Sequence, residues 1–88
     1  MSDSAFKALS DPTRREILRL LGKRVLTVGE IVERFSLSQP AISRHLAVLR
    51  QAGLVSAERN GQNVVYALDT TVFQEVVRAL MGLVPGRT

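Results

Sequence analysis

Apolar residues recur at intervals of three and four along most of the chain, which predicts a mainly helical protein. The clearest case follows Ser38, where Ile42, Leu46 and Leu49 fall at positions i, i+4 and i+7 and therefore share one side of a helix. Residues 72–81 have a similar spacing with a broader apolar stripe. The pattern predicts helices at about 3–9, 12–21, 28–35, 39–51 and 70–82.

Short polar residues and glycines mark the expected ends of these helices. Asp11 and Ser38 each precede a helical segment and can accept hydrogen bonds from its free N–H groups. Thr27 and Glu30 have the spacing of a capping box, in which each side chain bonds to the other residue's backbone N–H. Gly53 follows the fourth segment, as expected at a helix C-terminus.

Between the fourth and fifth helices, the periodicity changes to two. Apolar and polar residues alternate from Val55 to Leu68 on either side of Asn60-Gly61, a strong signal for a tight hairpin turn. Two strands are therefore expected here. Two helices joined by a short link and followed by a hairpin predict a winged helix-turn-helix, mainly α with a small β-hairpin.

Length and composition restrict the number of domains. The chain has 88 residues, of which 45% are hydrophobic, so we expect a single domain over residues 1–88. A domain this small buries only about 60–65% of its unfolded surface, which favours a dimer.

The chemistry available to the chain is narrow. It has no cysteine and one histidine, His45, which excludes a disulfide framework, a thiol nucleophile and a zinc site built from one chain. A Ser43–His45 dyad fails because residues two apart on a helix point roughly 200° apart. We therefore expect no enzyme activity, metal or cofactor. His45 is interpreted as a packed or phosphate-facing residue, in preference to a metal ligand or general base.

No segment resembles a targeting or membrane-spanning sequence. The N-terminal residues mix charged and apolar side chains, unlike a secretory signal. The apolar stretches 64–68 and 79–84 are far shorter than the roughly 20 residues that span a bilayer. We expect a cytoplasmic protein without membrane insertion.

The charge of the chain favours a polyanionic partner. Twelve Lys and Arg against eight Asp and Glu give a net charge of +4. Much of the excess lies in residues 34–63, which contain four arginines and one glutamate. A helix-turn-helix with this charge predicts binding to double-stranded DNA.

The fourth helix is the expected reading helix. Gln39 can pair with adenine and Arg44 with guanine in the major groove, while Ser43 can bond to a phosphate or base. Small side chains near its start let the positive end of the helix approach phosphate. The predicted DNA-binding residues of the helix and of the hairpin, or wing, are Ser38, Gln39, Pro40, Ala41, Ser43, Arg44, His45, Arg50, Arg59, Asn60, Gln62 and Asn63.

Four arginines outside this surface have two interpretations. Arg14, Arg15, Arg19 and Arg24 could contact phosphate, or they could form an ordinary solvated helix face. The sequence favours neither.

Three motifs resemble the ArsR family of bacterial winged-helix repressors. They are FKALSDPTRREIL from Phe6, SQPAISRHL with L-x-x-AGLV from Ser38, and R-x-G followed by Y-x-L from Arg59. The resemblance implies a homodimer that binds an imperfect inverted repeat in a promoter, often its own. It also implies pairing through the first helix, about 3–9, and the last helix, about 70–82. The expected interface residues are Ala5, Phe6, Leu9, Phe73, Val76, Val77, Leu80 and Met81.

The chain departs from the metal-sensing members of that family. Its third helix has no cysteine, and the last helix has Glu75 and the preceding Asp69 but no histidine. The sequence is more similar to the metal-independent subgroup typified by the SdpR autorepressor. Members of that subgroup are regulated by a protein partner or by no known ligand, so a regulatory protein partner is also considered.

Two alternatives to a metal-independent repressor remain. A winged helix can serve as a protein-interaction module, although the basic reading surface argues against that role here. A sensor for an organic ligand bound between the dimer helices is the other alternative.

Overall fold

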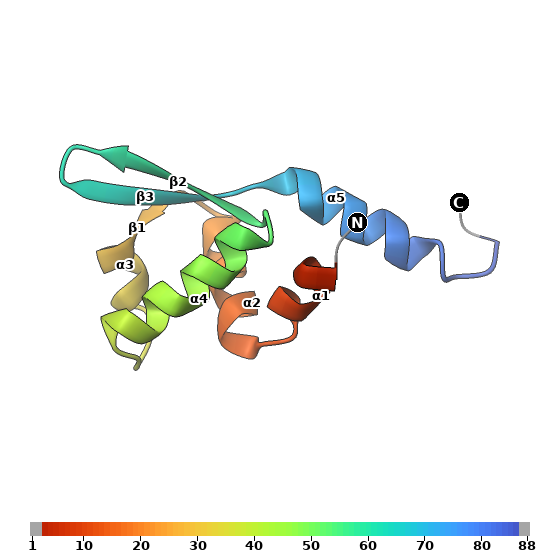
Figure 1. The fold of residues 1–88 in the computed structure, drawn as a ribbon, viewed down its shortest axis with the longest axis horizontal. Helices are drawn as coiled ribbons and strands as arrows, with labels where there is room; N and C mark the ends of the chain where they lie inside the picture. The colour runs from red at the N-terminus through yellow and green to blue at the C-terminus, as the bar shows by residue number, and fades with distance from the viewer. Residues whose placement is uncertain (1–2, 87–88) are drawn as a thin grey trace.

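The computed structural model describes residues 3–86 and has a winged helix-turn-helix fold (Figure 1). Its elements in chain order are α1 (Asp3–Leu9), α2 (Pro12–Leu21), β1 (Leu26–Thr27), α3 (Val28–Val32), α4 (Gln39–Gln51), β2 (Val55–Asn60), β3 (Asn63–Leu68) and α5 (Thr70–Met81). The predicted fold class is confirmed: helices dominate, and a three-stranded antiparallel sheet forms the wing and its base.

The helices begin at the predicted polar caps. The Asp11 carboxylate accepts from the backbone N–H of Arg14 at 3.0 Å, and the Ser38 hydroxyl accepts from that of Ala41 at 3.3 Å. The capping box before α3 has both of its bonds, joining Thr27 and Glu30. These local bonds satisfy N–H groups that a helix start otherwise leaves unpaired.

The C-terminus of α4 is closed by a Schellman motif. Leu54 N–H donates to the carbonyl of Leu49 at 3.0 Å, and Gly53 N–H donates to that of Arg50 at 3.0 Å. Gly53 has φ of +78°, a left-handed conformation in which a side chain is strained. The glycine cap predicted from the sequence is confirmed.

Two expectations about the middle of the chain were wrong. The third helix ends at Val32 rather than near Phe35, which lies in the turn before α4. A short strand, β1, was not expected. Leu26 and Thr27 pair with Tyr66 and Val65 of β3, so the sheet has three strands in the order β1-β3-β2 rather than two. A two-residue strand is too short to produce an alternating pattern.

The hairpin is present, with its turn one residue later than the Asn60-Gly61 signal suggests. Asn60 pairs with Asn63, which leaves Gly61 and Gln62 as the central turn residues. Gly61 has φ of +67° and Gln62 has a negative φ, the pattern of a type II′ turn. This turn suits the twist of two antiparallel strands.

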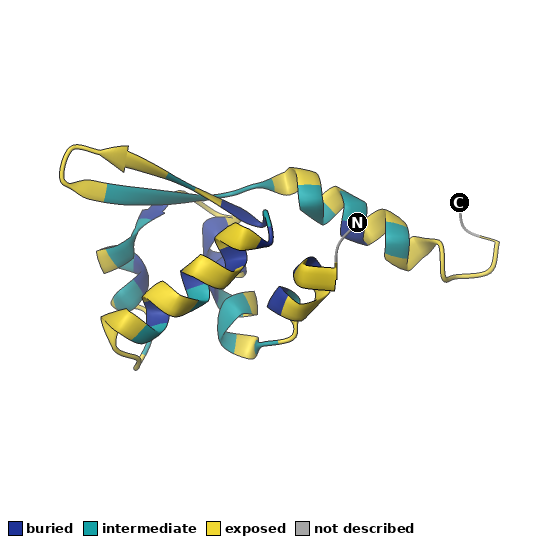
Figure 2. Cartoon of the chain, viewed as in Figure 1, coloured by how far each residue is buried: buried dark blue, intermediate teal, exposed yellow. Residues whose placement is uncertain are grey.

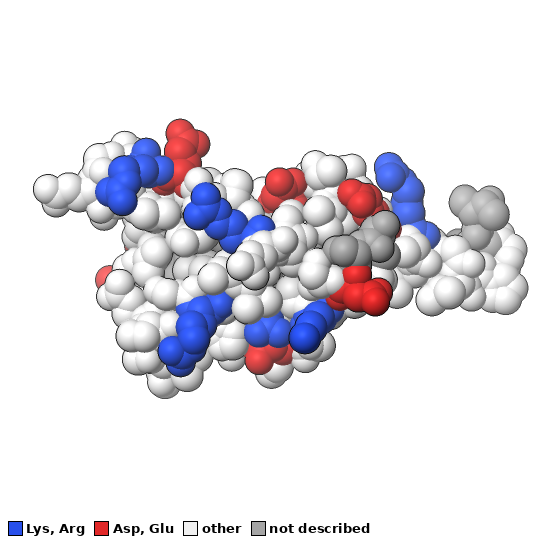
Figure 3. Space-filling view, in the orientation of Figure 1, with Lys and Arg blue, Asp and Glu red and all other residues white. Residues whose placement is uncertain are grey.

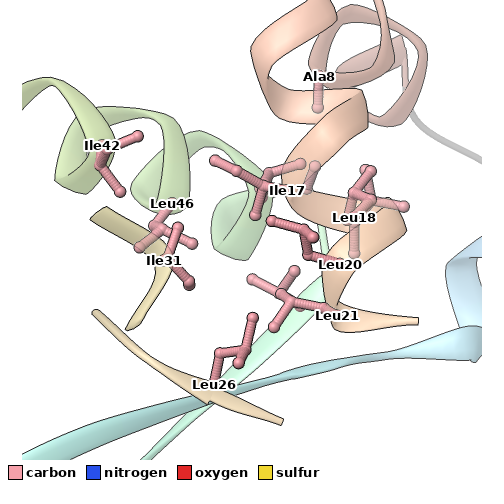
Figure 4. Packing of buried hydrophobic residues seen from close by; sticks show 13 residues of the cluster. Ala8, Ile17, Leu18, Leu20, Leu21, Leu26, Ile31, Ile42 and Leu46 are labelled. Carbon is pink, nitrogen blue, oxygen red and sulfur yellow. The ribbon is translucent and has the colours of Figure 1, made fainter. Parts of the chain in front are cut away.

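The core lies where α2, α3 and α4 meet the base of the sheet. Figure 4 shows Ile17 and Leu21 of α2 directed toward Ile31, Leu46 and Leu26. The apolar stripe predicted for α4 is fully buried: Ile42, Leu46 and Leu49 have at most 1% of their surface exposed. Burial of this stripe fixes which side of α4 faces outward.

The last helix projects beyond this core. The molecule measures 48 × 25 × 21 Å, and α5 extends along the longest direction (Figure 1). Within α5 only Val76 is buried, and the helix is otherwise half-buried or exposed (Figure 2). In residues 3–86, no helix is long and apolar enough to cross a membrane.

Candidate nucleic-acid interface

The outward side of α4 carries the residues predicted to read DNA. An α-helix turns about 100° per residue, so Arg44 lies roughly 200° from the buried Ile42. Gln39 and Ser43 lie on the flank of the buried stripe, and both are exposed. Figure 2 shows the side of α4 turned toward the viewer as largely exposed. One side of α4 therefore packs into the core, and the other side is free to contact DNA.

Ten of the twelve predicted DNA-binding residues are exposed, and two are half-buried. The half-buried residues are Ala41 and His45, both on the flank of α4. The exposed residues are Ser38, Gln39, Pro40, Ser43, Arg44, Arg50, Arg59, Asn60, Gln62 and Asn63. All twelve are therefore placed where solvent, or a partner, reaches at least part of the residue.

The wing extends away from α4 as a two-stranded ribbon (Figure 1). Arg59 and Asn60 end β2, Asn63 begins β3, and Gln62 lies in the turn. Their polar side chains stand on a ribbon whose strands leave the core together, which holds them at a distance from the body of the protein. Long and amide side chains at such a tip can contact a DNA groove or backbone.

Three arginine side chains of this surface are unpaired within residues 3–86. The guanidinium groups of Arg44, Arg50 and Arg59 make no hydrogen bond or ion pair with any of these residues. Figure 3 shows basic side chains over α4 and the hairpin on this face, with acidic side chains beside the basic ones of the hairpin and over the α1 and α5 half of the molecule. These charges are available to phosphate.

The four arginines for which the sequence allowed two interpretations are all bonded to other groups of the protein. Arg14 and Arg15 donate to carbonyl oxygens at the end of α1, and Arg15 reaches that of Leu9 at 2.8 Å. Arg19 pairs with Glu16 on its own helix, and Arg24 pairs with Glu30 at 2.8 Å. The structure therefore favours intramolecular roles for these four side chains, with Arg19 and Arg24 still in contact with solvent.

Several carboxylates are stabilised in their charged form. The backbone N–H of Arg14 lowers the pKa of Asp11, and the Thr27 backbone N–H lowers the pKa of Glu30. The hydrogen bonds of Arg19 lower the pKa of Glu16. The carboxylates of Asp11 and Glu30 cap helices, and that of Glu16 forms a surface ion pair.

One contact of the reading helix was not foreseen. Arg14 Nη1 lies 3.3 Å from His45 Nδ1, which links the start of α2 to α4. The two residues are 31 positions apart. No local spacing signals such a contact, so it could be found only from the tertiary structure.

Comparison with known proteins assigns this fold to a family. A family model described as "Bacterial regulatory protein, arsR family" matches residues 11–57, just over half of the chain. The chain belongs to the ArsR family of bacterial regulatory proteins. It is a DNA-binding transcriptional regulator, as its motifs predicted.

Its relatives are themselves named as regulators. Transcriptional repressor SdpR of Bacillus subtilis is 45% identical over 82 residues, covering 93% of this chain and 91% of the repressor. Transcriptional activator HlyU of Vibrio cholerae is 40% identical over 74 residues, covering 84% of this chain and 68% of the activator. Both regulators cover most of this chain.

Solved structures of ArsR-family regulators have the same fold. An ArsR-like regulator from Rhodococcus sp. RHA1 superposes with a TM-score of 0.86 at 34% identity, over 91% of this chain and 73% of that one. HlyU of Vibrio cholerae gives 0.76 at 39% identity, over 91% and 87%. Proteins of this family act as dimers.

The candidate dimer residues of this ArsR-family chain fall into three groups. Ala5 and Val76 are 1% and 4% exposed within one chain, so they are core residues and offer little surface to a partner. Leu9 and Phe73 are half-buried. The remaining candidates are exposed, from 37% to 56%, and are Phe6, Val77, Leu80 and Met81.

An open, mostly apolar depression runs along α5. Its volume is about 450 Å³, and it is lined by Thr70, Phe73, Gln74, Val77 and Arg78. The depression shares Phe73 and Val77 with the candidate dimer surface. In residues 3–86, no three His, Cys, Asp or Glu side chains are grouped in a way that could hold a metal ion.

Proposed function

We propose that this chain is a metal-independent homodimeric repressor that binds an inverted-repeat operator, with its own promoter as one candidate target. The observation that carries the proposal is the division between two sets of arginines. Arg44, Arg50 and Arg59 on α4 and the wing are unpaired within residues 3–86, while the arginines of α2 are bonded within the protein.

In the proposed complex, the N-terminal half of α4 lies in the major groove. Arg44 then pairs with guanine and Gln39 with adenine, because these side chains match the donors and acceptors of those base edges. The first turn of α4 also brings the positive end of the helix dipole toward phosphate. Arg59 and the amides of the wing contact the backbone or the adjacent minor groove.

Dimerisation would use the outward sides of α1 and α5 within a single domain of residues 1–88. Phe6, Val77, Leu80 and Met81 are exposed apolar residues on those helices, and burying them would be favourable. The high identity to repressor SdpR supports the repressor role. Regulation of this chain by a protein partner or by an organic ligand stays a prediction.

The test is selection of bound sequences from a random duplex library by the full chain in the presence of a chelator. Enrichment of one inverted repeat is the expected result, and it would identify the operator. A folded protein that enriches no sequence at modest salt would contradict the proposal and favour a protein-interaction module. Enrichment that appears only after a metal is added would contradict the metal-independent part.

Repression is tested separately from binding. The selected operator is placed within a promoter that drives a reporter gene, with a scrambled operator as the control. The expected result is lower reporter expression when the chain is produced, restored by the scrambled sequence. Increased expression from the intact operator would show an activator instead.

A further inference from the structure

Arg14 occupies the junction of α1, α2 and α4. Its Nε donates to the carbonyl oxygen of Ala8 at 2.7 Å, and its Nη2 donates to that of Lys7 at 3.1 Å. The remaining nitrogen of the fork, Nη1, lies 3.3 Å from His45 Nδ1. The first two bonds fix the guanidinium to the end of α1, so its third contact has a defined direction.

The chemistry of arginine decides which imidazole nitrogen carries the proton. A guanidinium has five N–H donors, no acceptor, and stays protonated in proteins. Nδ1 of His45 must therefore accept in this contact. In a neutral imidazole, the proton then resides on the other nitrogen, Nε2, which becomes a hydrogen-bond donor.

That donor is open to the surroundings. No hydrogen bond joins His45 Nε2 to any of residues 3–86. No side-chain nitrogen or oxygen of the described residues is both fully buried and without a partner. Nε2 of the half-buried His45 is therefore reached by solvent, on the helix that carries Arg44.

We propose that Arg14 is a positioning residue for DNA binding, which holds His45 as the Nε2–H tautomer so that α4 presents this N–H to a phosphate oxygen. The inference rests on the proposed role of α4 as the reading helix. Arg14 itself does not contact DNA in this scheme, since its guanidinium is engaged by α1 and His45. The Asp11 carboxylate of the α2 cap also interacts electrostatically with the imidazole, and Arg44 precedes His45 in the sequence of α4.

The first test reads the tautomer directly by ¹⁵N NMR at about pH 8, where an ordinary histidine is neutral. His45 is the only histidine in the sequence, so its signals need no assignment. The expected result is Nε2–H alone in the wild type and a mixture of tautomers in Arg14→Gln. A wild-type signal from Nδ1–H would overturn the proposal.

Arg15→Gln is the matched control. Arg15 is the next residue on α2, and it also donates to a carbonyl of α1, at 2.8 Å, but it makes no hydrogen bond with His45. The variant removes the same charge and a similar bond. It should leave the tautomer of His45 and the affinity for the selected operator close to wild type.

The second test is a double-mutant cycle on operator affinity. One positioned hydrogen bond predicts that Arg14→Gln lowers affinity about fivefold. His45→Ala should lower it as much or more, and adding Arg14→Gln to His45→Ala should cause no further loss. Equal losses from Arg14→Gln with and without His45 would mean that Arg14 acts only on the fold, which overturns the proposal.

A pair of histidine substitutions separates the two ends of the imidazole. Asn can supply an acceptor near Nδ1, and Gln can place a donor near Nε2. We expect His45→Gln to retain more operator affinity than His45→Asn, and the reverse order would contradict the outward donor. If the wild type binds no operator at all, the proposed function fails, whereas failure of this inference leaves wild-type binding intact.

Discussion

Arg44 is an exposed arginine on the outward side of a helix whose opposite side is completely buried. Its guanidinium has no partner among residues 3–86, so DNA contact does not require an existing ion pair to break. A bidentate arginine–guanine pair discriminates between bases because its two donors match two acceptors on one base edge. Arg44 is therefore the residue at which sequence reading is tested most directly.

Arg44→Ala should weaken binding to the selected operator by about 1–3 kcal/mol and relax the preference at one base position. The measurement is affinity for the operator and for its single-base variants at fixed salt. Arg19→Ala is the control, because Arg19 is exposed on α2 and already paired with Glu16. Equal losses in the two variants, or an unchanged base preference in Arg44→Ala, would contradict base reading by Arg44.

Arg59→Ala should have a different signature. As a phosphate contact at the wing, Arg59 contributes similarly to operator and random DNA, so its loss weakens both. The slope of log affinity against log salt should fall by about one. A loss confined to the operator would instead indicate that Arg59 reads bases.

The candidate site was largely predictable at this scale, because the position of α4's buried stripe determines which residues face outward. The role of Arg14 could not be predicted. The three groups that its guanidinium contacts lie on α1 and α4, so the sequence could not distinguish Arg14 from the arginines that face solvent. Long-range partners of flexible side chains leave no periodic pattern.

The caps that start α2, α3 and α4 are formed by residues three positions apart. Asp11 bonds to the Arg14 backbone, and Thr27 and Glu30 bond to each other. Sequence spacing predicted these elements because the interactions are local. It missed β1, whose two residues form a strand only by pairing with β3, and it overestimated α3, which ends before Phe35. Tertiary contacts decide such short elements.

The Asp11 cap predicts a pH-dependent contribution to stability. Its pKa in the folded protein is lowered from 3.8, so the charged carboxylate stabilises the fold above that value. The contribution is lost as the pH falls through the folded-state pKa. Asp11→Ala should lower the free energy of unfolding by about 1 kcal/mol at pH 7.

Urea denaturation at neutral and acidic pH checks this prediction. The difference between wild type and Asp11→Ala should shrink as the pH falls below the ordinary aspartate range. Asp11→Asn is the control, because asparagine caps helices about as well and does not titrate. A difference that stays constant down to about pH 2 would contradict the role of the carboxylate charge.

Gly53, which follows α4, allows the end of that helix to approach α5 closely. A Cβ built there would lie 2.9 Å from Cγ2 of Val72 on α5, and the glycine has φ of +78°. Gly53→Ala should therefore cost more than the roughly 1 kcal/mol expected for left-handed strain alone. Thermal and urea unfolding measure the loss.

Gly61→Ala is the matched control for Gly53→Ala. Gly61 has a similar φ of +67°, but a Cβ there would have no neighbour within 4 Å. It should show the strain without the steric contact. Val72→Ala should recover part of the stability lost in Gly53→Ala, and equal costs at the two glycines would argue against the close approach.

The whole molecule consists of a packed body and a projecting helix. The body carries the reading surface, whereas α5 exposes Val77, Leu80 and Met81 along the long axis. The small size of the domain predicted that part of its apolar surface would be left exposed and available for dimerisation. It could not show that Ala5 and Val76 are already covered within one chain.

Val77→Asp should separate the copies of a dimer without unfolding the body, since Val77 is 56% exposed in a single chain. Sedimentation should report a monomer, and operator affinity should fall because each half-site is then bound independently. Thr71→Asp is the control, with the same added charge on an exposed residue of α5 outside the apolar stripe. A Val77→Asp protein that remains dimeric would place the interface elsewhere.

The buried and outward sides of α4 also differ in what a mutation costs. Ile42, Leu46 and Leu49 are fixed by packing, while Gln39, Ser43 and Arg44 have no side-chain bonds to the rest of residues 3–86. Changes on the outward side therefore alter DNA preference at little cost to folding. A few substitutions on the outward side of α4 can therefore give such a protein new target genes during evolution. For the same reason, α4 is the element to redesign when a different DNA sequence is to be recognised.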